Sequence, residues 1–240
     1  MFEKITPKHI NTWADFTMPV WFLGLCITLP LGLYYALFNS PADYQQGESV
    51  RIMYIHVPSA YIATSAYAGL ALSSAFILIW KSPASEIIAR SIAPLGMVAS
   101  TMCLFTGAIW GQPTWGTWWV WDARLTSVLI LFFIYVTYIA TAYAFDDKGG
   151  GSKPAAILAV AGAINLPVIR YSVDWWNTLH QPASLIRDGG ASIHPDILLP
   201  LLLMVGAFTC GFAILFIWRI RTITAQRKIK TLLKQKAQKV

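Results

Sequence analysis

Long uncharged runs of apolar residues dominate the pattern along the chain. A membrane-spanning helix needs about 20 mostly apolar residues, and backbone amides in hydrocarbon must be paired within the segment. Each run is therefore predicted to be a helix, because the strands of a membrane barrel would alternate over about ten residues. The runs are Met18–Phe38, Ile55–Trp80, Ser91–Trp110, Leu125–Phe145, Pro154–Ile169 and Ile197–Trp218. The pattern predicts an all-α integral membrane protein with six transmembrane helices.

The fifth run is shorter than the other five. It contains Gly162, Asn165 and Pro167, so we expect it to be kinked or to extend as far as Val173. The expected organisation is one six-helix membrane domain over residues 1–240. Its helices are predicted at about 18–38, 55–80, 91–110, 125–145, 154–173 and 197–218.

Composition strengthens the membrane prediction. Hydrophobic residues make up 56% of the chain and charged residues 12%, against about 25% charged in soluble domains. The mean hydropathy is +0.55. These values exclude a soluble enzyme, a secreted disulfide scaffold and a disordered chain. The three cysteines lie inside apolar runs and form no CxxC pair, so neither a disulfide framework nor covalent haem attachment is expected.

Basic residues predict the orientation. All 18 lysines and arginines fall on one side of the six-helix arrangement except Arg51, Arg124, Arg170 and Arg187. Because basic loops stay in the cytoplasm, both termini are predicted to be cytoplasmic. Residues 219–240 then form a basic cytoplasmic tail that can contact anionic membrane lipid. We expect no nucleic-acid partner.

The unusual residues fall in the three outer loops, and the segment 110–124 is the strongest signal. Five of the 11 tryptophans lie within it. Gly111, Pro113 and Gly116 predict a turn, and a short interfacial helix after it would place tryptophans on one face. Such a surface suits a large, flat, apolar ligand. The alternative is an interfacial anchor, since tryptophan favours membrane surfaces. The tryptophans are Trp110, Trp115, Trp118, Trp119 and Trp121.

Two histidines and three arginines are the other candidates on the outer face. His56 and His180 could clamp one haem iron between two imidazoles, or they could be unrelated interfacial histidines. Arg51, Arg124 and Arg170 could hold haem propionates through forked hydrogen bonds. The alternative is a pair of local ion pairs, one joining Asp43 to Arg51 and the other joining Asp122 to Arg124.

Five segments together resemble a known family. Residues 115–126 (WGTWWVWDARLT) resemble the tryptophan-rich WWD segment of proteins that handle haem in cytochrome c maturation. Four flanking segments narrow the resemblance to the CcmC family, the haem lyase or haem export component of that system. These are 41–47 (PADYQQG), 54–58 (YIHVP), 165–169 (NLPVI) and 171–180 (YSVDWWNTLH).

The resemblance implies a site and a set of partners. Six helices would hold haem b at the periplasmic face of the bacterial inner membrane, with His56 and His180 as the axial ligands of the iron. Polar residues of the first outer loop, Asp43, Gln46 and Arg51, are implicated as well, whereas His194 has no counterpart. The tryptophan segment, including Trp115, Trp118, Trp119, Trp121 and Asp122, would form the haem surface. The implied partners are the haem chaperone CcmE, the small membrane subunit CcmD and the CcmAB ATPase.

The sequence therefore favours a scaffold that presents haem to CcmE. No side chain resembles a nucleophile or an acid–base pair for a separate reaction, so whether the chain is itself an enzyme stays open. None of the six runs contains a charge, which favours presentation at the outer face over translocation. The alternatives are an electron-transfer membrane protein with a b-type haem, a non-catalytic assembly subunit and a larger member of the tryptophan-rich family, against which the short chain argues.

Overall fold

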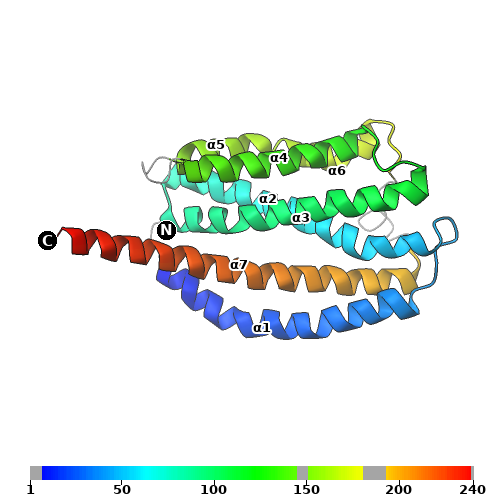
Figure 1. Ribbon diagram of the computed structural model, residues 1–240, viewed down its shortest axis with the longest axis horizontal. Helices are drawn as coiled ribbons and strands as arrows, with labels where there is room; N and C mark the ends of the chain where they lie inside the picture. The colour runs from blue at the N-terminus through cyan, green and yellow to red at the C-terminus, as the bar shows by residue number, and fades with distance from the viewer. Residues whose placement is uncertain (1–6, 145–150, 181–192, 239–240) are drawn as a thin grey trace.

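The computed structural model describes residues 7–144, 151–180 and 193–238, and these residues are almost entirely helical (Figure 1). The described residues contain six helical spans long and apolar enough to cross a membrane. This confirms the prediction of an all-α protein with six such helices. The spans are Thr12–Asn39, Glu48–Trp80, Pro83–Trp115, Ala123–Ala144, Ser152–Trp175 and Pro195–Ala237.

The helices run side by side along the long axis of the molecule. In Figure 1, α2 and α3 lie between a layer of α4, α5 and α6 and a layer of α7 and α1. The long helices are α1 (Pro7–Tyr34), α2 (Met53–Trp80), α3 (Pro83–Trp115), α4 (Ala123–Ala144) and α7 (Pro195–Ala237). The shorter elements are the π-helical turn η2 (Tyr35–Asn39), the 3₁₀ turn η3 (Glu48–Ile52), α5 (Ser152–Gly162) and α6 (Asn165–Trp175).

The fifth span is broken where its sequence predicts a kink. Helix α5 ends at Gly162 and α6 begins at Asn165. A Cβ atom at Gly162 would stand 2.2 Å from the hydroxyl of Tyr67, so only glycine lets α5 approach α2 this closely. Asn165 donates a hydrogen bond of 2.8 Å to the Ser127 carbonyl on α4. Contacts with two neighbouring helices therefore hold the break in place, and α6 carries the span on to Trp175.

A tyrosine pair fixes the middle of the bundle. Tyr67 of α2 and Tyr135 of α4 are fully buried and pack edge to face, with ring centroids 5.2 Å apart. Tyr67 donates to the Ala159 carbonyl at 3.0 Å and Tyr135 to the Ala63 carbonyl at 2.8 Å. Because each buried hydroxyl has a partner, the core gains connections between helices without the cost of an unpaired polar group.

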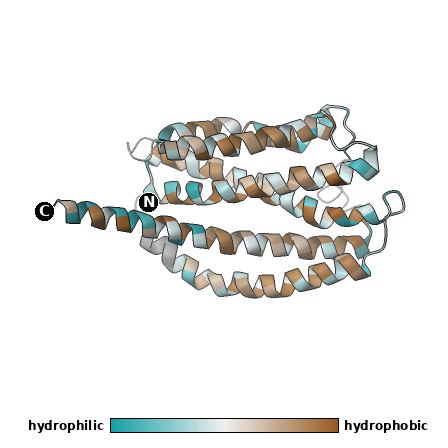
Figure 2. Ribbon diagram, in the orientation of Figure 1, coloured by the Kyte–Doolittle hydropathy of each residue, from teal (hydrophilic) through white to brown (hydrophobic). Residues whose placement is uncertain are grey.

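The two ends of the bundle differ in chemistry. Hydrophobic residues fill the middle of the helices, and hydrophilic residues gather at the ends and along the last turns of α7 (Figure 2). We call the end that holds Trp115, Asp122 and His180 the tryptophan end. The opposite end, where α1 and α3 begin and the last turns of α7 lie, is the basic end (Figure 1).

Candidate functional site

The tryptophan segment has a different local structure from the one its sequence predicts. Helix α3 continues through Gly111 and Pro113 to Trp115, and the left-handed Gly116 (φ 74°) ends it. No short helix follows, because residues 116–122 form bends and irregular chain. The hydroxyl of Thr117 hydrogen-bonds to the Trp119 carbonyl at 3.2 Å and stabilises this turn. The predicted short helix with tryptophans on one face is therefore wrong, and the turn comes at Gly116 alone.

Asp122 joins the tryptophan segment to His180. Its Oδ1 accepts a hydrogen bond of 2.7 Å from the Leu125 amide in the first turn of α4, as helix-capping residues do. Its Oδ2 lies 3.1 Å from Nδ1 of His180. Trp115 packs edge-on against the same imidazole, with centroids 4.8 Å apart. The start of α4, the end of α3 and the loop after α6 thus meet at one histidine.

His180 lies outside the membrane-capable helices and is partly buried. Burial lowers the pKa of His180 below its usual value, although the hydrogen bond to Asp122 acts in the opposite direction. The imidazole is therefore neutral at neutral pH. A neutral imidazole is the form that binds metal ions.

His56 has its own set of contacts on α3. Its Nδ1 lies 3.2 Å from the Thr106 hydroxyl, and its ring packs edge-on against Trp110 at 5.6 Å. A Cβ atom at Gly107 would stand 3.0 Å from Cε1 of the ring, so glycine leaves room for the imidazole. The sequence pattern did not single out Thr106 or Gly107. The spacing of Thr106 and Trp110, four residues apart on one helix face, was the only signal available.

The structure brings the two histidines to the same end of the bundle. His56 contacts Thr106 and Trp110 in the last part of α3, and His180 contacts Trp115 at the end of the same helix. Arg124 also donates from Nε to the Ser172 hydroxyl at 2.9 Å and contacts the Arg170 carbonyl at 3.5 Å. The local pair expected between Asp122 and Arg124 is replaced by the contact of Asp122 with His180.

The first loop reaches the same cluster through Gln46. Asp43 accepts hydrogen bonds from the Gln45 and Gln46 amides at 2.9 and 2.8 Å, which closes a tight turn. The side chain of Gln46 then accepts from Nε1 of Trp110 at 2.9 Å. Trp110 is the residue that packs against His56, so this turn supports the His56 side of the site.

Arg51 is committed to contacts within the fold. It forms an ion pair with Glu48 and donates to the carbonyls of Ala36 and Ser40. The expected ion pair between Asp43 and Arg51 is therefore wrong, because the 3₁₀ turn places Glu48 beside Arg51. These contacts join η2 to η3 just before α2 carries His56 into the site.

Two indole rings of the tryptophan segment are exposed at the surface. Trp118 and Trp121 expose 61% and 75% of their surface, whereas Trp115 and Trp119 are half-buried. Trp119 packs edge-on against Trp121 at 5.5 Å. Its Nε1 is buried and has no hydrogen-bond partner in the described part of the chain. The segment therefore combines exposed aromatic faces with one unsatisfied donor.

The two histidines suit a metal ion that is already coordinated by most of its ligands. Among residues 7–144, 151–180 and 193–238, no three His, Cys, Asp or Glu side chains gather as a metal cluster. Structural and catalytic zinc sites need three or four protein ligands. Haem iron needs only one or two axial ligands, because the porphyrin supplies the other four.

Several curated proteins are similar to this chain over most of their length. "Heme exporter protein C" of Bradyrhizobium diazoefficiens is 44% identical over 232 residues, which cover 97% of this chain and 88% of that protein. The protein of the same name from Escherichia coli is 43% identical and covers 93% of this chain and 90% of that protein. A "putative cytochrome c biosynthesis ccmC-like mitochondrial protein" of Marchantia polymorpha is 43% identical, covering 84% of this chain and 86% of that protein.

The family match is equally extensive. The sequence model of the family "Heme exporter protein C", CcmC, matches residues 1–235. This range includes the first five helical spans, all but the last two residues of the sixth, and both histidines of the tryptophan end. The chain therefore belongs to the heme exporter protein C (CcmC) family.

Proposed function

We propose that this chain binds one haem b at the tryptophan end and presents it, as cargo, to the haem chaperone CcmE during cytochrome c maturation. Membership in the CcmC family supports a role in haem handling within that system. The observation that carries the proposal is that His56 and His180, 124 positions apart, are both held through Nδ1 at one end of the bundle.

The hydrogen bonds fix which nitrogen of each ring is available. The Thr106 hydroxyl donates its single proton to the Met102 carbonyl at 2.6 Å, so its oxygen accepts from Nδ1–H of His56. Nδ1–H of His180 donates to the Asp122 carboxylate. A neutral imidazole that donates through Nδ1 carries its lone pair on Nε2. Metal-binding histidines usually donate the other ring N–H in this way, which supports iron ligation through Nε2.

The tryptophan segment supplies the surface for the ring. Exposed faces of Trp118 and Trp121 offer dispersion and edge–face contacts to a porphyrin. The half-buried Trp119 packs against Trp121, and Trp115 packs against His180. This arrangement favours a haem surface over a simple membrane anchor, because Trp115 contacts a histidine.

Arg124 is the arginine best placed for a haem propionate. Its Nε donates to the Ser172 hydroxyl, and it lies two residues after Asp122, which contacts His180. An arginine fork matches a carboxylate, so Arg124 would set which edge of the porphyrin faces outward. The first outer loop acts on the site indirectly, through Trp110, which packs against His56. This loop is held by Asp43, Gln46 and Arg51.

The orientation follows from the distribution of charge. The basic end carries the tail of α7 and, by the positive-inside rule, faces the cytoplasm. Both termini are then cytoplasmic, and the tryptophan end faces the periplasm, at the outer surface of the bacterial inner membrane. Haem held there is accessible to a periplasmic chaperone.

The chain contributes positioning to the reaction. Holding haem in one orientation removes much of the entropic cost of bringing it to CcmE. The CcmD subunit and the CcmAB ATPase are the further partners that we propose for the assembly. The described spans carry their charged residues close to the two ends, except on α7, where basic residues run from Arg219 to the end of the helix; presentation therefore fits better than a polar route for haem through the bilayer.

The test is haem loading of CcmE in membranes that contain the complete maturation system. His56→Gly and His180→Gly are expected to abolish covalent haem on CcmE while the protein stays in the membrane. His194→Gly is the matched control, since His194 lies exposed at the same end, before α7. Unchanged loading in either of the first two variants, or an equal loss in the control, would contradict the proposal.

A further inference from the structure

The guanidinium of Arg124 at the tryptophan end is held by helix α6. Its Nε donates to the Ser172 hydroxyl at 2.9 Å, and its Nη2 contacts the Arg170 carbonyl at 3.5 Å. Ser172 is fully buried near the end of α6, and its own hydroxyl proton goes to the Ile169 carbonyl at 3.0 Å. The Ser172 oxygen therefore accepts from Arg124, and the direction of this hydrogen bond is fixed.

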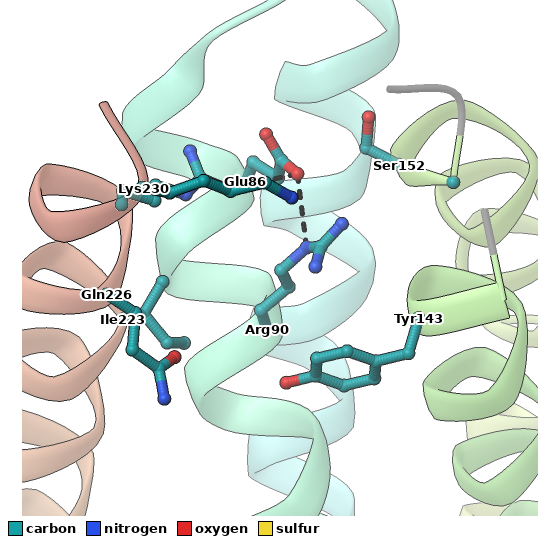
Figure 3. A pocket seen from close by; sticks show the side chains of 9 residues that line it. Glu86, Arg90, Tyr143, Ser152, Ile223, Gln226 and Lys230 are labelled. Atoms are coloured by element: carbon teal, nitrogen blue, oxygen red, sulfur yellow. Dashed lines mark ion pairs between the residues drawn. The ribbon is translucent and has the colours of Figure 1, made fainter. Parts of the chain in front are cut away.

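Two other arginines direct Nε to a carboxylate, where Arg124 has a serine. Nε of Arg90 pairs with Glu86 at 3.1 Å (Figure 3), and Nε of Arg51 pairs with Glu48. A carboxylate at Nε neutralises the positive charge of a guanidinium. A serine hydroxyl orients the same group but carries no charge. The contact at Nε therefore fixes Arg124 without neutralising it.

The acidic residues close to Arg124 in this part of the fold do not pair with it either. Asp122 is engaged with the His180 imidazole. Asp174, near the end of α6, forms no ion pair with Arg124 in the part of the chain that the structure describes. Arg124 therefore keeps a positive charge that a carboxylate of a ligand can pair with.

The contact with α6 also decides which edge of the guanidinium is free. A guanidinium can hold a carboxylate side-on, through Nε and one Nη atom, or end-on, through both Nη atoms. Ser172 occupies Nε, which closes the side-on arrangement. Nη1 has no hydrogen-bond partner among the described residues. The end-on edge is therefore the one that a carboxylate can use.

Two hydrogen bonds fix α6 against α4 in the register that this requires. Asn165 at the start of α6 donates to the Ser127 carbonyl at 2.8 Å, and Ser172 accepts from Arg124. The two residues of α6 lie about two helical turns apart and therefore on the same face. Because α6 starts afresh after the break that follows α5, this face is turned toward α4.

We propose that Ser172 is a positioning residue that presents the end-on edge of Arg124 to one propionate of haem. With Nε held, the guanidinium does not have to be ordered when the propionate binds, and a preorganised donor binds more tightly than a mobile one. This inference rests on the proposed role of Arg124 in haem binding. It adds that the orientation of haem depends on the attachment of α6 to α4.

The experiment measures the affinity of the purified full-length chain for ferric haem and for haem dimethyl ester. Ser172→Ala should weaken binding of haem about three- to tenfold and leave the affinity for the ester unchanged, because the ester lacks charged propionates. Ser127→Ala is the matched control, since this buried hydroxyl bonds to the Arg124 carbonyl and not to its guanidinium. Equal losses for both ligands in Ser172→Ala, or an equal loss in the control, would overturn the inference.

A double variant separates an action through Arg124 from a general effect on the fold. Ser172→Ala should cause no further loss of haem affinity in a chain that already carries Arg124→Gln. A further loss of the same size would show that Ser172 acts elsewhere. Equal affinities of the wild type for haem and its ester would contradict the proposed role of Arg124 itself. Unchanged haem affinity in Ser172→Ala, in a chain that prefers haem to the ester, would overturn the role of Ser172 alone.

Discussion

The Asp122 carboxylate holds Nδ1 of His180 at 3.1 Å and caps α4 through its other oxygen. One side chain therefore has a structural role and a role in orienting a histidine. The two roles respond differently to substitution, because an amide can still cap a helix but carries no charge to attract an imidazole N–H.

Asp122→Asn should weaken haem binding while leaving stability close to that of the wild type. Loss of the carboxylate behind a metal-binding histidine typically lowers affinity about 10–100-fold. Asp122→Ala should in addition lower the free energy of unfolding by about 1 kcal/mol, since the cap is lost. Haem titration and thermal unfolding measure the two effects. Asp196→Asn is the control, because Asp196 lies beside the exposed His194 at the start of α7. Wild-type affinity in Asp122→Asn would contradict this role.

Thr106→Val should weaken haem binding about tenfold, because valine keeps the shape of threonine but cannot accept Nδ1–H of His56. Thr106→Ser should restore binding. Thr101→Val provides the control on the same helix, where the hydroxyl bonds only to the Met97 carbonyl. The measurement is a haem titration of each purified variant. Failure of the serine variant to rescue would show that volume, and not the hydrogen bond, matters at this position.

Gly107→Ala should separate stability from binding. The new Cβ would stand 3.0 Å from Cε1 of His56 and push the ring by a few tenths of an ångström. Alanine stabilises a helix interior by about 1 kcal/mol relative to glycine, so Tm should not fall even though haem affinity drops. Gly211→Ala has nothing within 4 Å and should leave haem affinity unchanged. Equal haem affinities in the two variants would argue against a tight fit around His56.

Arg124→Gln should weaken binding of haem but not of haem dimethyl ester, which lacks charged propionates. A tenfold loss, equivalent to about 1.4 kcal/mol, is expected for the free acid. Arg51→Gln should lower stability and leave the ratio of the two affinities unchanged, since Arg51 is bound to Glu48 and to two carbonyls. Titrations of each variant with haem and with its dimethyl ester measure the two affinities. An equal loss of affinity for both ligands in Arg124→Gln would show that Arg124 does not bind the propionates.

The membrane architecture could be predicted from the sequence because the bilayer imposes a simple rule on length and polarity. The ends of the helices could not. The third predicted helix begins at Ser91, because the charged Arg90 precedes it. In the structure α3 begins earlier, at Pro83. Arg90 stays helical because Glu86, one turn earlier, pairs with it. Local charge marks the edge of hydrocarbon, whereas hydrogen bonds and ion pairs decide where a helix ends.

The candidate site was predictable in residue type and only partly in detail. Aromatic density and the positions of His56 and His180 indicated one end of the molecule, and the structure places Trp110 against His56 and Trp115 against His180 there. The partner of His56 depends on how α2 and α3 rotate against each other, which no pattern within α3 reveals. The short helix expected after the turn is absent because Gly116 and the Thr117 hydrogen bond favour an irregular path to Asp122.

The most direct test of the central claim is the low-temperature electron paramagnetic resonance spectrum of ferric haem bound to the purified full-length protein. Ligation by both imidazoles predicts a low-spin spectrum in the wild type and in His194→Gly. It predicts a high-spin spectrum in His56→Gly and in His180→Gly, which returns to low-spin when free imidazole is added. A low-spin spectrum that survives in both single variants would show that other groups hold the iron.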